Sequence, residues 1–173
     1  LKGYPAFEGR IQYQQEGEDA FQRNQLLNND NLVIESCQTI NLEEQSKPLS
    51  LKASVHINPT AQKKGKKITF SPLAGLISDE PLFPEKKRLY PTQFPYRTEE
   101  IYMTTITLPE GASVVSLPEP MVLDLIEGAG SFKFQINQRK NTLTVISKMT
   151  LSETYFGNSA YEVLKQFFDL IFA

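Results

Sequence analysis

Cys37 and His56 are the chain's only cysteine and only histidine, and a thiol beside an imidazole is the smallest unit of nucleophilic cysteine catalysis. Strands expected at 32–42 and 49–57 would form a hairpin that could bring the two side chains together. A reactive thiolate, however, needs a helix N-terminus or cationic neighbours, and Cys37 lies among strand-forming residues. We therefore favour a structural Cys37 and a solvated surface His56, with a Cys/His hydrolase as a distant alternative.

Metal and cofactor chemistry find little support in the sequence. A zinc site requires three or four Cys or His ligands, and the chain has two such residues. The oxygen-rich 28–31 stretch could contact calcium, but it lacks the glycine and the distal glutamate of an EF-hand loop, and a polar turn is the simpler interpretation. No phosphate-binding glycine motif follows a strand. We expect no metal and no cofactor.

The charged side chains form no diagnostic catalytic pattern. A pair of carboxylates could act as in a glycosidase, but the spacing of the candidates along the chain is not diagnostic. These candidates are Glu99, Glu100, Glu110, Glu119, Asp124 and Glu127. The lysines at 63, 64, 66 and 67 surround Gly65, and a charged hairpin tip explains them better than a localisation signal.

One proline-rich and aromatic segment offers a candidate interaction surface. Seven of the eleven prolines lie between positions 81 and 120, and two arginines flank a cluster of rings within this stretch. The candidate residues are Arg88, Tyr90, Phe94, Tyr96 and Arg97. They could form a ligand platform, although extended proline and aromatic crossings more commonly seal the edge of a sheet, and we favour that packing role.

Hydrophobic periodicity predicts the elements that must position these residues. Alternation with a period of two predicts strands at 7–13, 32–42, 49–57, 68–70, 99–108, 113–117, 132–136 and 143–151. A short helix is expected over 19–27. The end of the chain changes to helical spacing after a capping box at Ser159 and Glu162. The apolar stripe of this last helix contains Val163, Leu164, Phe167, Phe168 and Ile171.

This pattern predicts a mainly β protein, an antiparallel β-sandwich with a short N-terminal helix and a C-terminal amphipathic helix. We expect an N-terminal β-rich half at 1–80, a proline-rich crossing at 81–98 and a C-terminal β-rich half with the closing helix at 99–173. A single continuous domain is the alternative.

Composition excludes several classes of protein. The chain has 173 residues, 40% of them hydrophobic, which is enough for a buried core without disulfides. A net charge of -2 gives no reason to expect nucleic acid as a partner. No apolar run reaches the length of a membrane span. Because the sequence starts at Leu1, we expect a processed product or a piece of a longer protein.

Several short motifs follow one another in the second half of the chain. The order is 82–88 (LFPEKKR), then Pro91 and 94–96 (FPY), then 108–111 (LPEG) and 116–119 (SLPE). The final helix contributes Tyr161, Leu164, Lys165, Phe167 and Phe168. This order resembles the C-terminal region of large transglutaminase-like proteins of Bacteroidetes. The stretch from 3 to 23 resembles the segment that leads out of such a protein's papain-like core.

The resemblance implies a function without chemistry of its own. The family's catalytic Cys, His and Asp belong to the preceding core, and no residue here matches them. We therefore expect a non-catalytic accessory domain that packs against, or restricts access to, a transglutaminase-like core in the same polypeptide. The resemblance also implies a periplasmic, cell-surface or extracellular location. A peptide- or glycan-binding module is the alternative, and the absence of Trp weakens its glycan version.

Overall fold

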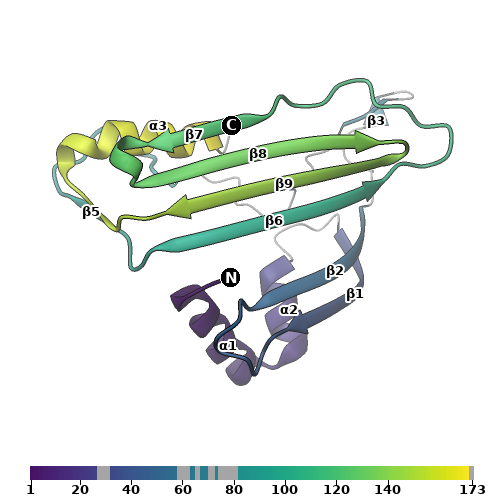
Figure 1. The fold of residues 1–173 in the computed structure, drawn as a ribbon, viewed down its shortest axis with the longest axis horizontal. Helices are drawn as coiled ribbons and strands as arrows, with labels where there is room; N and C mark the ends of the chain where they lie inside the picture. The colour runs from purple at the N-terminus through teal and green to yellow at the C-terminus, as the bar shows by residue number, and fades with distance from the viewer. Residues whose placement is uncertain (27–31, 58–62, 65–66, 70–72, 74–81, 172–173) are drawn as a thin grey trace. The chain divides into compact units, whose positions relative to one another are not determined.

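The computed structural model describes residues 1–26, 32–57, 63–64, 67–69, 73 and 82–171. The chain divides into two compact units, Leu1–Ser78 and Asp79–Ala173, whose elements are labelled in Figure 1. The strands of the described residues pair in an antiparallel sense, and three α-helices accompany them. The predicted mainly β class with antiparallel sheets is therefore confirmed.

Unit 1 begins with helix α1 (Tyr4–Glu16), so the strand predicted over 7–13 is wrong. The alternation of apolar residues there is incidental, because the buried residues follow helical spacing instead. Ala6, Gly9 and Arg10 are buried, and half-buried Tyr13 packs against the same core. Pro5 stands in the first turn, where a helix tolerates proline. The buried face consists of small residues and one arginine, so hydrophobicity alone does not reveal it.

The predicted short helix and the following hairpin of unit 1 are confirmed. Helix α2 (Glu18–Leu26) buries Phe21, and strands β1 (Leu32–Ile40) and β2 (Ser50–Ile57) pair with a register irregularity between Ile34 and Ser36. Phe21 and Leu49 are fully buried and pack with Ala6. Two-residue strands β3 (Lys63–Lys64) and β4 (Lys67–Ile68) also pair. The 28–31 turn and the tip at 65–66 lie outside the described residues.

Unit 2 is built on a four-stranded antiparallel sheet with the order β6-β9-β8-β7 (Figure 1). Its strands are β6 (Thr98–Thr107), β7 (Met121–Leu125), β8 (Gly130–Arg139) and β9 (Thr142–Leu151). The register places even-numbered residues of β6 and β8 on the same face as odd-numbered residues of β7 and β9. That face carries the buried side chains of β9, whereas Ile101, Met103 and Val122 are exposed on the opposite face.

Two parts of unit 2 differ from the sequence-based expectation. The strand predicted over 113–117 is wrong, since residues 108–120 contain no strand and Val115 is 77% exposed. A strand forms instead at β7, which begins directly after Pro118 and Pro120. The backbone of β7 pairs with β8 in an antiparallel sense. Short strands β5 (Thr92–Gln93) and β10 (Tyr155–Phe156) also pair, and this long-range contact left no periodic signal in the sequence.

Helix α3 (Tyr161–Ile171) confirms the predicted C-terminal amphipathic helix, and it packs against the β7 side of the sheet. Leu164, Phe167 and Phe168 are buried in the core of unit 2, as the stripe predicts. Val163 is 42% exposed, so its placement in the buried stripe is wrong, and Tyr161 occupies the core instead. The hydroxyl group allows Tyr161 to enter the core because it donates a 2.7 Å hydrogen bond to the Glu85 carbonyl.

Candidate interaction surface

The hairpin of unit 1 does not bring Cys37 and His56 together. The register places Cys37 opposite Ala53 and His56 opposite Val33, which separates the two side chains by about three residues, or ~10 Å, along the strands. Burial raises the pKa of the Cys37 thiol, and the Glu18 carboxylate raises it further. A raised pKa reduces the thiolate fraction, which is the opposite of what a nucleophilic cysteine requires.

We therefore predict that Cys37→Ala and His56→Ala leave the turnover of the intact parent protein unchanged. Neither side chain has an activating neighbour, so neither substitution removes a group that acts on substrate. The measurement is steady-state kinetics of each variant beside a melting curve. A large loss of turnover with an unchanged melting curve would contradict the prediction.

The two candidate carboxylates that share a row of the sheet are too far apart for a glycosidase pair. Glu99 on β6 and Asp124 on β7 lie in one register row of the sheet, but three strand spacings of ~4.8 Å separate them by ~14 Å. A glycosidase pair requires roughly 5 to 9.5 Å. Glu99 also lies 3.0 Å from the Lys148 ammonium. Glu100 accepts a 3.3 Å hydrogen bond from Tyr102, whose pKa rises to about 12 through burial and the nearby carboxylate.

Two further functional classes gain no support from the described part of the chain. Across the described residues, no group of three or more His, Cys, Asp or Glu side chains has the arrangement of a metal site. None of the helices described here combines the length and the apolar composition that a membrane span requires.

The proline and aromatic segment has an inner side that builds the core of unit 2. Phe83 is 4% exposed, and Phe94 is half-buried against the same core. The Phe94 ring stacks on Phe168 at a centroid distance of 6.0 Å and meets Phe83 and Phe156 edge to face. The structure therefore assigns Phe94 to core packing, the role that the sequence favoured for this segment.

Arg88 lies between the core and the surface. Its guanidinium carbon is 5.8 Å from the centroid of Phe83 and 5.7 Å from that of Tyr161. One guanidinium nitrogen donates a 3.2 Å hydrogen bond to the hydroxyl of buried Thr92. A cation over aromatic rings stabilises a folded loop by about 0.5 to 1 kcal/mol at an exposed site. Arg88 thus fixes the backbone conformation of the residues beside it.

The outer side of the segment is a basic–aromatic loop, residues 86–91, with the sequence KKRLYP. Leu89 is 85% exposed and Tyr90 is 79% exposed, the two largest values among the exposed large hydrophobic residues. The preceding Lys86 and Lys87 are exposed as well. Exposing the apolar surface of two large side chains to water is unfavourable in free energy. An exposed apolar pair beside positive charges is therefore typical of a surface that binds a partner.

Both ends of the basic–aromatic loop are fixed to unit 2. Before the loop, the carbonyl of Phe83 accepts a 2.6 Å hydrogen bond from the Lys165 ammonium, and the Glu85 carbonyl accepts the bond from Tyr161. After the loop, Thr92 pairs with Phe156 in the β5–β10 ladder. The residues on both sides of the loop are therefore anchored, which lowers the entropic cost of ordering its exposed residues on binding.

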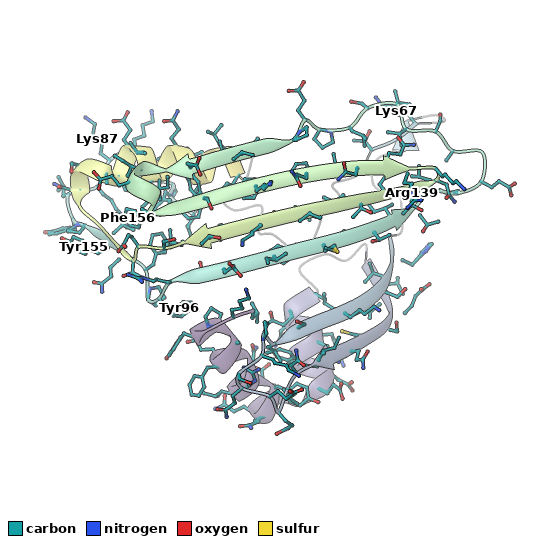
Figure 2. The ribbon with its side chains drawn as sticks, viewed as in Figure 1. Lys67, Lys87, Tyr96, Arg139, Tyr155 and Phe156 are labelled. Carbon is teal, nitrogen blue, oxygen red and sulfur yellow. The ribbon has the colours of Figure 1, made fainter. Side chains whose placement is uncertain are left out.

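The remaining candidate residues lie near this loop in the sequence but differ in environment. Tyr96 is half-buried, whereas the Arg97 guanidinium lies 3.6 Å from the Glu153 carboxylate with both side chains largely exposed. Figure 2 shows Lys87, Tyr96 and Tyr155 at one end of unit 2. The candidate residues chosen from the sequence did not include Leu89 or Tyr155. The side chain of Tyr155 is 63% exposed. Alternation with buried Phe156 is the signal that could have identified Tyr155.

Comparison with known proteins places most of the chain in one family. A family model described as a domain of unknown function with a solved structure, DUF3858, matches residues 66–173. A crystal structure of a "putative protease" from Parabacteroides distasonis is similar at 21% identity, with a TM-score of 0.47 and coverage of 58% of this chain. The chain spans 19% of the length of that protein. No curated protein matches the chain. Since the family model covers more than half of its residues, the chain belongs to the DUF3858 family.

Proposed function

We propose that the chain is a non-catalytic accessory domain of an exported bacterial transglutaminase-like protein, and that it packs against the catalytic core or restricts access to it. The observation that carries the proposal is the basic–aromatic loop, which exposes Leu89 and Tyr90 on a fixed backbone. Unit 2 already has its own aromatic core, so these two side chains are available for an intermolecular or interdomain contact.

The chemistry of the loop specifies the surface that it fits. Leu89 and Tyr90 require an apolar pocket, because a large side chain that becomes fully buried contributes about 1.5 to 3 kcal/mol. Lys86 and Lys87 favour acidic residues at the rim of that pocket. Aromatic anchors surrounded by charged rim residues are typical of protein interfaces.

Two finer statements belong to this proposal. The antiparallel pairing of the strands and the apolar residues on one face of the four-stranded sheet support the proposal of a sandwich. The motif order of the sequence supports an origin in Bacteroidetes and a periplasmic or cell-surface location. The parent protein's catalytic residues then belong to its upstream core.

A peptide- or glycan-binding module is the second candidate. The exposed rings of Tyr90 and Tyr155 favour it, because aromatic side chains provide contact area at low entropic cost. A soluble ligand that changes the chemical shifts of these two rings, with no effect of the domain on the parent's core, would favour this candidate.

We predict that the double variant Leu89→Ser/Tyr90→Ser weakens binding of chain 1–173 to the separately supplied upstream core by about 10- to 100-fold, since two interface anchors are lost. Lys86→Glu/Lys87→Glu should weaken it as well, and added salt should then strengthen binding by screening the new repulsion from the acidic rim. Calorimetric titration measures both effects.

The matched control is Val115→Ser. Val115 is 77% exposed and lies in unit 2 outside the loop, so its replacement removes a comparable solvated side chain without changing the proposed contact. Equal affinity of Val115→Ser and of Leu89→Ser/Tyr90→Ser for the upstream core would contradict the proposed interface. Unchanged kinetics of the parent protein after deletion of the whole domain would overturn the accessory role.

A further inference from the structure

Strand β6 is an edge strand of the four-stranded sheet in unit 2. All ten of its residues pair with β9 in continuous register, from Thr98 opposite Leu151 to Thr107 opposite Thr142. Within the described residues, no strand pairs with its other side. A long regular edge presents a row of backbone donors and acceptors to any strand that aligns with it.

The two edges of the sheet differ in how well they are protected. Strand β7 has five residues, follows Pro118 and Pro120, and ends in a 3-10 turn where Glu127 has a φ of 55°. Strand β6 contains no proline and no lysine, and seven of its ten residues are β-branched or aromatic. Natural proteins protect edges with short strands, prolines and charged residues, above all lysines. Strand β6 is long, has no proline or lysine, and carries its two charges, Glu99 and Glu100, near one end. The composition of β6 is that of a strand with a partner.

The residues of β6 complement a second copy of the same strand. We consider two copies of β6 that pair in an antiparallel sense about a two-fold axis at Met103. Glu99 of one copy then faces Thr107 of the other, and Glu100 faces Ile106. The acidic residues of the two copies then lie at opposite ends, where they do not repel each other. Exposed Met103 faces its own copy, and Ile101 lies diagonal to it. Four apolar side chains thereby leave water.

We propose that β6 is a homodimer interface, in which two copies of the chain join their sheets through antiparallel β6–β6 pairing centred on Met103. The pairing makes one continuous eight-stranded sheet from the two four-stranded ones. Backbone hydrogen bonds provide the affinity, and the placement of Glu99, Glu100, Ile101 and Met103 determines the register. The interface is separate from the basic–aromatic loop and does not depend on the accessory role.

The oligomeric state of chain 1–173 tests the proposal, measured by sedimentation equilibrium over a range of concentrations. We expect a dimer, and we expect Met103→Lys to weaken it at least ~100-fold, because two ammonium groups would meet at the two-fold axis. Val122→Lys is the matched control, since Val122 is 64% exposed on the same face but lies on β7. It should leave the dimer intact.

A charge-swap experiment separates pairing from misfolding. Met103→Glu should also be monomeric, and an equimolar mixture of Met103→Lys and Met103→Glu should recover a dimer with opposite charges at the axis. Leu89→Ser/Tyr90→Ser should dimerise like the wild type, which distinguishes this interface from the proposed contact with the core. A monomeric wild type, a dimer indifferent to Met103→Lys, or a mixture that stays monomeric would each overturn the proposal.

Discussion

Arg10→Ala is expected to destabilise unit 1 by about 3 to 5 kcal/mol, because it removes a set of charge-assisted hydrogen bonds that contribute about 1.5 to 3 kcal/mol each where they are shielded from water. Arg10 is 8% exposed, and its guanidinium donates hydrogen bonds to five backbone carbonyls. These belong to Ala6, Asn41, Leu42, Glu44 and Lys47. Four of them lie in the connection between β1 and β2, so one side chain holds that connection against α1. Removing it leaves the buried Ala6 carbonyl and four part-buried carbonyls without this donor.

Hydrogen exchange of peptides from 1–26 and 32–57 measures this loss within unit 1. Arg10→Lys should be nearly as unstable, since an ammonium has three donors and cannot match the planar geometry of a guanidinium. Low millimolar guanidinium ion, well below denaturing concentrations, should partly restore protection in Arg10→Ala by entering the vacated site, whereas sodium should not. Arg23→Ala is the control, because Arg23 is exposed on α2. Wild-type protection in Arg10→Ala would contradict the prediction.

Arg10 also explains why the sequence pattern predicted a strand over 7–13, where α1 forms. The helix buries Ala6, Gly9 and Arg10, and an arginine on a buried face contributes nothing to a hydrophobic pattern. The outward residues Tyr4, Phe7 and Ile11 are apolar and at least 36% exposed, so neither side of α1 is markedly more hydrophobic than the other. A pattern method assumes that apolar side chains face the core, and α1 violates this assumption.

Elements with strong local periodicity could be predicted from the sequence. The β8–β9 hairpin and α3 each bury one regular face, and their sequences contain that face within a short window. The β1–β2 hairpin was predictable from its alternation alone, because no described side chain of its strands is fully buried. The pairing of β5 with β10 joins Gln93 to Tyr155, more than 60 residues later in the chain. Such long-range pairing depends on how the whole unit packs, which a local window does not contain.

The candidate surface was predictable as a segment but not residue by residue. Prolines and rings identified the stretch that contains Arg88, Tyr90 and Phe94. Only the packing against α3 shows that Phe94 faces inward while Tyr90 and Leu89 face water. The separation of Cys37 from His56 likewise depends on strand register, which the sequence left undetermined.

Phe168→Ala should lower the unfolding midpoint of unit 2 more than any other substitution in α3. Phe168 is 3% exposed, and its ring lies 5.4 Å from Phe83, 5.3 Å from Phe167 and 6.0 Å from Phe94, measured between centroids. Its truncation leaves a cavity among rings that the sheet and the 82–97 segment hold in place, so collapse cannot fill it. We expect a loss of about 3 to 5 kcal/mol, a large part of the ~5 to 15 kcal/mol that stabilises a domain.

Thermal and urea unfolding of chain 1–173, followed by circular dichroism, measure the effect of Phe168→Ala. Phe167→Ala should cost less, because the Phe168 ring contacts Phe167 and also joins the helix to Phe83 and Phe94. Val163→Ala is the matched control on the same helix, since Val163 is 42% exposed and alanine favours a helix. If Phe168→Ala kept the wild-type midpoint but no longer bound the upstream core, the α3 stripe would be an interdomain contact surface rather than the core of unit 2.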